Sequence, residues 1–187
     1  MKKLLIFIFI SFSFLLNGAD DPKNPDDPKI DNDNKTVKKF NIEYRKEDGF
    51  YTKGVIEGMK GFYLNELSWK GNENRDQNIY IDFVKSIEVK GYTMKKTQKD
   101  NLSIVFYIPY LFDIELKNGT SIKGAIGRIK EIESFTAYNE IGREKCYTYF
   151  MRYWLEDKQM FLHNSSKDYN EKPEVPKSTV VFIEFND

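Results

Sequence analysis

Residues 102–126 read LSIVFYIPYLFDIELKNGTSIKGAI, and this stretch decides the fold. Apolar, β-branched and aromatic residues dominate its first half, which is the composition of a β-strand. Pro109 cannot donate a hydrogen bond to a neighbouring strand, so it belongs at an edge or a bulge. Asn118-Gly119 follows, and this dipeptide is a strong signal for a type I′ turn between antiparallel strands. The stretch therefore predicts a β-hairpin that returns through residues 122–126.

The hairpin has a second copy earlier in the chain. Residues 48–56 align without gaps on residues 118–126, and both follow the pattern (D/N)-G-x-x-x-K-G-x-I. A glycine at the turn can adopt the left-handed conformation, and the later glycine can occupy a bulge. The predicted structural glycines of the repeat are Gly49, Gly54, Gly119 and Gly124.

Period-two patterns extend through the rest of the body, and no sustained 3.6-residue period is present. We therefore expect a mainly β protein with little or no helix outside a signal peptide. The repeat favours two tandem antiparallel β-meander modules, barrel-like or sandwich-like, over residues 37–101 and 102–187, with an insertion around residues 135–175 in the second. Further predicted strands cover residues 62–69, 122–135 and 145–155, and residues 94–101 are predicted as a lysine-rich connection.

The N-terminus has the three parts of a secretory signal peptide. Lys2 and Lys3 supply positive charge, residues 4–16 form an apolar run, and short side chains precede a cleavage point near Ala19. An uncleaved membrane anchor is the alternative, but a helix of that length falls short of the roughly 30 Å hydrocarbon core. No cysteine lies near the cleavage point, which argues against a lipoprotein. We expect residues 1–19 to be removed during export.

Residues 20–36 read DDPKNPDDPKIDNDNKT, a segment rich in proline, aspartate and asparagine. This composition cannot bury enough apolar surface to offset the entropy lost on ordering, so we expect a disordered acidic linker. Calcium binding is the alternative interpretation. Residues 31–34, however, lack the glycine and the distal glutamate of an EF-hand loop.

Charge argues against one class of partner. The chain has 29 basic and 29 acidic residues, whereas a nucleic-acid-binding protein carries a strongly basic surface. We therefore expect no nucleic-acid partner. After the signal peptide no apolar run reaches the length of a transmembrane helix, so none is expected after cleavage. A small outer-membrane β-barrel is an alternative, although lysines on both faces of most predicted strands disfavour it.

The sequence offers little for catalysis. It contains one cysteine, Cys146, and one histidine, His163. A lone histidine without a second ligand nearby does not indicate a metal site, and a nucleophilic cysteine needs a positioned base. We predict no catalytic residue, no metal and no cofactor. The enzyme alternative is a hydrolase of envelope polysaccharide that uses two carboxylates. Candidate carboxylates include Glu131, Glu133, Glu140 and Glu144.

Aromatic residues supply the positive functional signal. They make up 16% of the chain and are dense in residues 146–155, CYTYFMRYWL. If this run is one strand, alternate residues share a face, which places Tyr147, Tyr149 and Tyr153 on the same side. Burial of both faces is the simpler outcome. If one face stays exposed, these tyrosines are the better binding candidates, because a tyrosine at a partly exposed position can bury its ring and still hydrogen-bond to water through its hydroxyl.

These observations favour a soluble, exported bacterial envelope protein, periplasmic or located elsewhere in the cell envelope. We expect a non-catalytic binding or scaffold module that uses strand edges or an aromatic face. Its partner would be a protein or a glycan of the envelope. Shape and apolar contact, more than charge, would hold that partner, because the net charge is zero.

Overall fold

The computed structural model describes residues 37–99, 102–162 and 174–186. The predicted signal peptide and linker, residues 1–36, lie outside the described residues, as does His163. Contacts between residues divide the chain into Met1–Asn34 and Lys35–Asp187, and the fold below is that of the second unit.

The fold is mainly β, as predicted, with 63% of the described residues in strands and 5% in helices. The described helices are a 3-10 turn (Ile81–Phe83) and a short helix α1 (Lys130–Glu133). Within the described residues, no helix is long and apolar enough to cross a membrane. The strands are β1 (Val37–Lys46), β2 (Tyr51–Lys60), β3 (Val84–Lys99), β4 (Leu102–Leu116), β5 (Ser121–Ile126), β6 (Ser134–Asn139), β7 (Gly142–Tyr147), β8 (Phe150–Leu155), β9 (Met160–Phe161) and β10 (Val180–Asn186).

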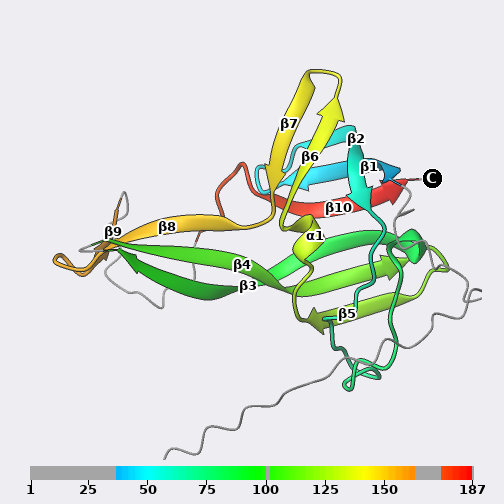
Figure 1. Ribbon diagram of the computed structural model, residues 1–187, viewed down its shortest axis with the longest axis horizontal. Coiled ribbons are helices and arrows are strands. Elements are labelled where there is room, and N and C mark those ends of the chain that lie inside the picture. The colour runs from blue at the N-terminus through cyan, green and yellow to red at the C-terminus, as the bar shows by residue number, and fades with distance from the viewer. Residues whose placement is uncertain (1–36, 100–101, 163–173, 187) are drawn as a thin grey trace, which may run out of the picture. The chain divides into compact units, whose positions relative to one another are not determined.

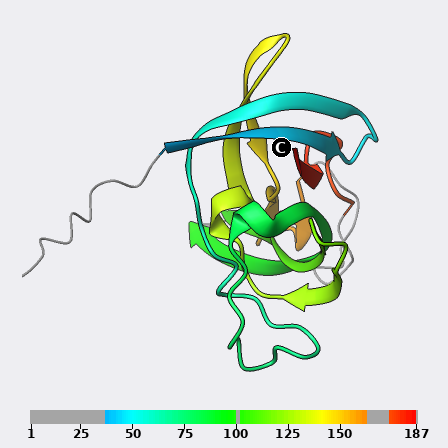
Figure 2. The ribbon, with the colours of Figure 1, turned by 90° about the vertical axis from the view of Figure 1, so that its right-hand side faces the viewer.

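The strands of the described chain form one antiparallel sheet that curls into a half-barrel (Figure 1, and turned by 90° in Figure 2). The order is β7-β6-β2-β1-β10-β3-β4-β8-β9, and β5 pairs with β4 outside this path. The last strand, β10, lies between β1 and β3. Strands from both sides of residue 101 therefore pair with one another, and the division of the body into two modules stays a prediction.

The two copies of the sequence repeat form turns of the same geometry. In each copy the glycine N–H donates to the carbonyl three residues earlier at 2.9 Å. Gly49 and Gly119 have left-handed φ angles of 90° and 87°. The side chain before each glycine, Asp48 or Asn118, accepts a hydrogen bond from the N–H two residues onward. The same four-residue turn therefore closes the β1–β2 and β4–β5 hairpins.

The later glycines of the repeat differ from each other. Gly124 has a φ of 66° and lies at a bulge, where its N–H donates to the Asp113 carboxylate at 2.9 Å. Gly54 lies in regular pairing with Ile42. A Cβ at Gly54 would come within 3.0 Å of the Tyr138 carbonyl oxygen. Gly54 therefore permits the close approach of β6 to β2 and forms no bulge.

Residues 62–69 are not the strand that the sequence predicts. They form a loop that joins other segments through isolated bridges, such as the bridge from Ser68 to Ile126. Phe62, Leu64 and Leu67 are nevertheless buried, so the loop contributes to the core. Aromatic and apolar composition indicated burial correctly here, but burial does not require a strand.

Two other boundaries also differ from the prediction. Residues 94–99, expected in a connection, extend β3 because each pairs with a residue of β4. Residues 122–135 do not form one strand, since the chain leaves β5 after Ile126 and enters α1 before β6. Gly127 marks this break, because a Cβ there would overlap the backbone carbonyl of Glu66.

The described residues form two hydrophobic cores. The larger fills the half-barrel with inward side chains of β1, β2, β3, β4 and β10, together with the loop before the 3-10 turn. Its most deeply buried members include Ile42, Tyr44, Ile56, Phe112 and Ile114. The smaller core contains Val105, Tyr107, Phe150, Trp154 and Phe161.

The smaller core belongs to a ribbon of strands that projects from the half-barrel (Figure 1). We call this ribbon the arm and define it as residues 92–99, 102–109, 150–155 and 160–161. The pairing of β3 with β4 changes register on both sides of Gly91, where the arm begins. On its other side, β4 pairs with β8 up to Tyr107 and with β5 from Leu111 onward, so Pro109 falls in the gap between these two neighbours.

Candidate functional site

The aromatic run 146–155 is divided between two strands and is not the single strand that the sequence predicts. Tyr147 ends β7 and Phe150 begins β8. Between them, Thr148 is buried, and its N–H and hydroxyl donate to the carbonyls of Glu133 and Ile132, both at 3.0 Å. These bonds hold Thr148 against the segment before β6. The chain therefore stops pairing with β6 after Tyr147, at the end of β7, and pairs with β4 from Phe150 onward, as β8.

The alternation predicted for this run persists across the break. Cys146, Thr148, Phe150 and Trp154 are buried, whereas Tyr147 and Tyr153 are 41% and 37% exposed. Tyr149 is half-buried, and its ring meets that of Tyr147 edge-on, with centroids 5.4 Å apart. The tyrosine face is therefore the more exposed of the two faces.

The three tyrosines do not form one continuous row. Tyr147 lies opposite Ser134 of β6, whereas Tyr153 lies opposite Ile104 of β4. Tyr153 instead neighbours Met151 on β8, and its hydroxyl lies 3.9 Å from the Met151 sulfur. The structure thus separates the predicted binding residues into a Tyr147–Tyr149 pair and a Tyr153–Met151 pair.

Tyr153 and Met151 belong to a larger apolar surface on the arm. Directly paired residues share a face of a sheet, and these two pair with Ile104 and Phe106. The opposite edge of the same face carries Lys95 and Thr97 of β3. We define the apolar arm face as Leu102, Ile104, Phe106, Ile108, Met151, Tyr153 and Leu155, all half-buried or exposed. None of these side chains belongs to either core of the described chain.

The other face of the arm is filled by the smaller core. Tyr107 stacks on Phe150 with centroids 4.7 Å apart, and Trp154 meets Phe161 edge-on at 4.9 Å. The Arg152 guanidinium lies 3.9 Å from the centre of the Phe161 ring, a cation–π contact. β9 pairs with β8 at the edge of the sheet and adds Phe161 to this face, against which Val175 also packs. Neither core of the described chain covers the other face.

The β4 part of this surface was missed by the sequence analysis, although its signal is present. Residues 102–108 alternate in burial, with Ser103, Val105 and Tyr107 buried and the residues between them half-buried. Both sets are rich in apolar residues, so periodicity does not distinguish the packed face from the open one. The pairing of β4 with β8 decides which face is packed, because it places Tyr107 on the same face as Phe150 of the smaller core.

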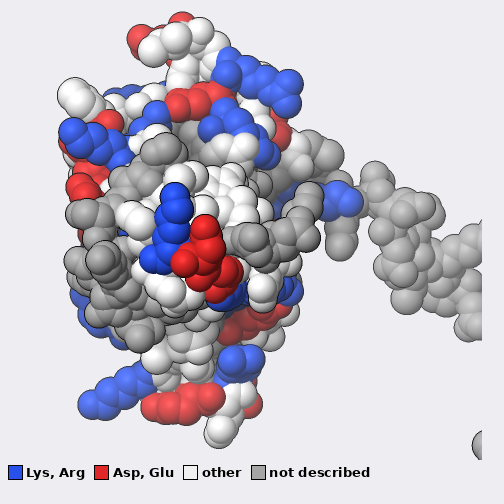
Figure 3. Space-filling model, turned by 90° about the vertical axis from the view of Figure 1, so that its left-hand side faces the viewer, with Lys and Arg blue, Asp and Glu red and all other residues white. Residues whose placement is uncertain are grey.

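One ion pair on the arm joins β3 to the residue after β8. Lys96 and Glu156 form an ion pair at 2.5 Å, and the Ser103 hydroxyl donates to the same carboxylate at 2.6 Å. Lys96 and Ser103 together lower the pKa of Glu156. Seen from the tip of the arm, basic and acidic side chains are interspersed and neither sign forms a continuous patch (Figure 3). The surface on this side is thus not dominated by one charge.

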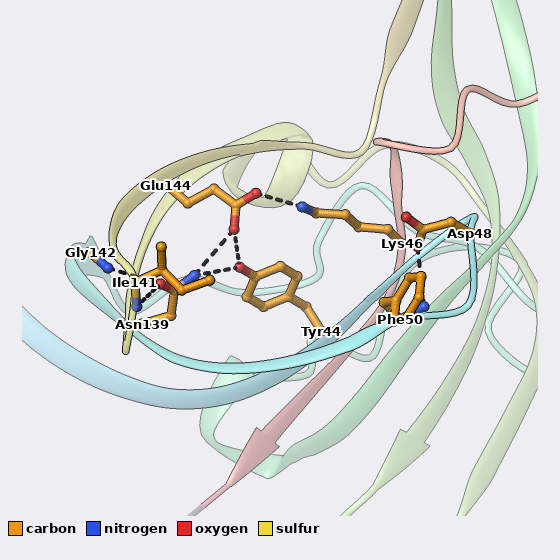
Figure 4. A network of polar contacts seen from close by, with 8 residues as sticks. All are labelled: Tyr44, Lys46, Asp48, Phe50, Asn139, Ile141, Gly142 and Glu144. Carbon is orange, nitrogen blue, oxygen red and sulfur yellow. Dashed lines mark hydrogen bonds and ion pairs between the residues drawn. The ribbon is translucent and has the colours of Figure 1, made fainter.

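A second polar cluster joins β1 to the β6–β7 hairpin (Figure 4). The Tyr44 hydroxyl donates to Glu144 at 2.5 Å, and Lys46 reaches the other oxygen of that carboxylate at 2.5 Å. The Asn139 amide donates to both Tyr44 and Glu144 at 3.3 Å. Two segments that are distant in sequence, β1 and the β6–β7 hairpin, therefore meet at one carboxylate.

The protonation states of this cluster favour a structural role. Burial and the neighbouring Glu144 raise the pKa of Tyr44, so its hydroxyl stays protonated. Burial by itself would raise the pKa of Glu144, but bonds from Lys46 and Tyr44 hold that pKa below its ordinary value. Burial also raises the pKa of the Cys146 thiol to about 11, which leaves little thiolate at neutral pH.

The candidate carboxylates of the hydrolase alternative are placed as follows. Glu133 receives a hydrogen bond from Arg128 at 2.7 Å, and Glu144 is held in the cluster above. Glu131 and Glu140 are exposed. Among the described residues, no aspartate or glutamate is fully buried, and no group of histidine, cysteine and carboxylate side chains could hold a metal ion.

Comparisons with family models, with curated proteins and with solved structures find no match to this chain.

Proposed function

We propose that this protein is a non-catalytic binding module of the bacterial cell envelope and that its apolar arm face docks on a partner protein. One observation carries the proposal. The arm has two apolar faces, and the cores of the described chain account for one of them. Apolar patches that stay exposed on a folded domain commonly mark interaction sites.

The chemistry of the face favours a protein over a glycan. Aliphatic and thioether side chains occupy five of its seven positions, namely Leu102, Ile104, Ile108, Met151 and Leu155. A glycan site needs aromatic platforms with hydrogen-bonding groups nearby, whereas a flat apolar sheet face suits another sheet or helix. Met151 adds adaptability, because methionine is flexible and polarisable and is frequent on binding surfaces.

The location in the envelope is part of this proposal. A basic start, an apolar run and short residues before Asp20 support export through a signal peptide. The acidic segment that follows would then separate the cleavage point from the sheet. The protein used in the binding experiment therefore begins at Asp20.

The test is capture of a partner from envelope extract by the chain that begins at Asp20. The Met151→Ser/Tyr153→Ser double variant should reduce capture at least about tenfold, because it makes the centre of the face polar. Tyr138→Ser is the matched control, since Tyr138 is 42% exposed and lies on β6, away from the arm.

A photoreactive phenylalanine analogue at position 153 identifies the contact directly. It should give a discrete cross-linked species with a protein, and the same analogue at position 138 should not. Equal capture by the wild type and the double variant would refute the proposal, as would cross-linking from position 138 alone.

A further inference from the structure

A cleft opens between β2 and β6, on a part of the sheet separate from the arm. Its volume is about 730 Å³, which lies within the range of ligand sites. Its lining comes from residues 56–63 on one side and from α1, β6 and β7 on the other. The cleft therefore lies between two neighbouring strands of the sheet, β2 and β6.

The cleft exists because β2 and β6 separate after a short contact. They pair at two positions, Val55 with Tyr138 and Ile56 with Ala137, and no further. Beyond that point β2 continues along β1 through a register shift, where Gly58 has a φ of 79°. On the other side, β6 continues along β7 to its first residue.

Within the described part of the chain, each wall is thus a strand that is paired along one edge and free along the other. On one side Glu57, Met59 and Lys60 pair with β1, and on the other residues 134–136 pair with β7, but these two segments do not pair with each other. A free strand edge presents unpaired N–H and C=O groups, which are satisfied by an extended backbone. The separating edges border the cleft on its two sides.

The side chains around the cleft indicate which peptide would fit. Ile56, Phe62 and Phe135 are buried members of the larger core that line the cleft, so they provide an apolar floor. Lys60 and Lys145 stand exposed on opposite walls, and neither forms an ion pair among the described residues.

Two glutamates also line the cleft, and they offset only part of the positive charge of these lysines. Glu57 is held by Lys39 at 2.7 Å, which leaves Glu131 as the acidic group without an ion pair among the described residues of the lining. The lining therefore favours apolar side chains facing the floor and acidic side chains facing the rim.

We infer that the cleft binds an extended segment of a partner polypeptide by β-strand addition between β2 and β6. Residues of that segment alternate between apolar and acidic. The apolar side chains face the apolar floor, and the acidic side chains face Lys60 and Lys145. The four residues 57–60 offer an edge about 13 Å long at about 3.3 Å per residue, enough for a short peptide. This inference does not depend on the arm face, because the two surfaces share no residue.

The probe is a fluorescein-labelled eight-residue peptide of alternating valine and glutamate with blocked ends. Fluorescence polarisation should show saturable binding to the chain that begins at Asp20. The same peptide with N-methylated backbone amides should lose binding, because it cannot donate to the free edges. A valine–lysine peptide should bind at least about tenfold more weakly, because it faces Lys60 and Lys145.

Variants locate the site. Lys60→Glu and Lys145→Glu should each weaken binding about tenfold, whereas Lys53→Glu should leave it unchanged. Lys53 is a matched control, because it is an exposed lysine on the same strand outside the cleft. Bound peptide should also slow amide hydrogen exchange at residues 134–136 and leave exchange at residues 121–126, in β5, unchanged.

Three results would overturn the inference. One is the absence of saturable binding, and another is equal binding of the N-methylated peptide. The third is an equal loss with Lys53→Glu, which would show attraction by general surface charge.

Discussion

At the scale of single residues, the turn glycines show how one position determines a local conformation. Gly49 and Gly119 take the same left-handed φ at the same place in the repeat, and nothing lies within 4 Å of a Cβ built on either. Steric space is therefore not the reason for glycine here. The reason is the backbone conformation, which costs an L-residue roughly 1–2 kcal/mol.

Replacing Gly119 with alanine should therefore lower the free energy of unfolding by about 1 kcal/mol. Gly119→Asn should cost less, because asparagine tolerates the left-handed region better than alanine. Urea unfolding followed by circular dichroism gives both values. Equal losses for alanine and asparagine would show that the turn does not need this conformation.

At the scale of elements, the β6–β7 hairpin is tied to β1 by Glu144. The carboxylate contacts Tyr44 and Lys46 of β1, and the Tyr44 ring meets Phe135 of β6 edge-on at 6.1 Å. Between β2 and β6 there are two paired positions, so side chains supplement a short ladder. The tie therefore helps to position the wall of the cleft.

The tie should make stability depend on pH. The folded state holds the pKa of Glu144 below its ordinary value of 4.5, so its contribution is fully present above that value. The contribution is lost as the pH falls through the folded-state pKa. Glu144→Gln should cost about 1–2 kcal/mol at pH 7 and progressively less as the pH is lowered from 4.5 to 3.

Unfolding free energies of the wild type and the variant at pH 7, 4.5 and 3 check this expectation. Glu140→Gln is the control, because Glu140 is exposed and lies in the same hairpin. A cost of Glu144→Gln that stays constant with pH would contradict an ionic tie.

At the scale of the whole molecule, the last described strand lies in the middle of the sheet. β10 pairs with β1 at six positions and with β3 at three, and its residues Val180 and Ile183 are core members. The first and last described strands are therefore neighbours. Pairing between strands so far apart in the sequence is expected to slow folding, because the entropy of closing a long loop is lost before the contacts form.

Deleting residues 180–187 should consequently abolish cooperative folding. β1 and β3 would lose the strand between them, and the larger core would open along one side. Near-ultraviolet circular dichroism and thermal unfolding of the chain from 20 to 179 test this, with the chain from 20 to 187 as control. A cooperative transition in the shortened chain would mean that the half-barrel does not require β10.

Much of the fold follows from local pattern. The hairpins at residues 40–56 and 102–126, the turn glycines Gly49 and Gly119 and the mainly β class all depend on contacts within short segments. The greater exposure of the Tyr147, Tyr149 and Tyr153 face agrees with the alternation read from the sequence. These features are predictable because side chains alternate across any strand.

The remaining features depend on partners that are distant in the chain. Residues 94–99 are polar and rich in lysine, and they become a strand because β4 lies beside them. Composition likewise does not show the break at Thr148, which arises from hydrogen bonds to residues 132 and 133. The open face of the arm and the cleft between β2 and β6 depend on which strands pair and on where that pairing ends.

The sequence by itself determined the mainly β class, the turn glycines Gly49 and Gly119 and the two-faced character of the aromatic run, because periodicity and glycine conformation act over a few residues. Only the tertiary structure decided which apolar face is packed, that β10 completes the centre of the sheet, and where strand edges stay free. The physical reason is that burial and pairing are properties of two surfaces in contact, and one segment specifies only its own surface.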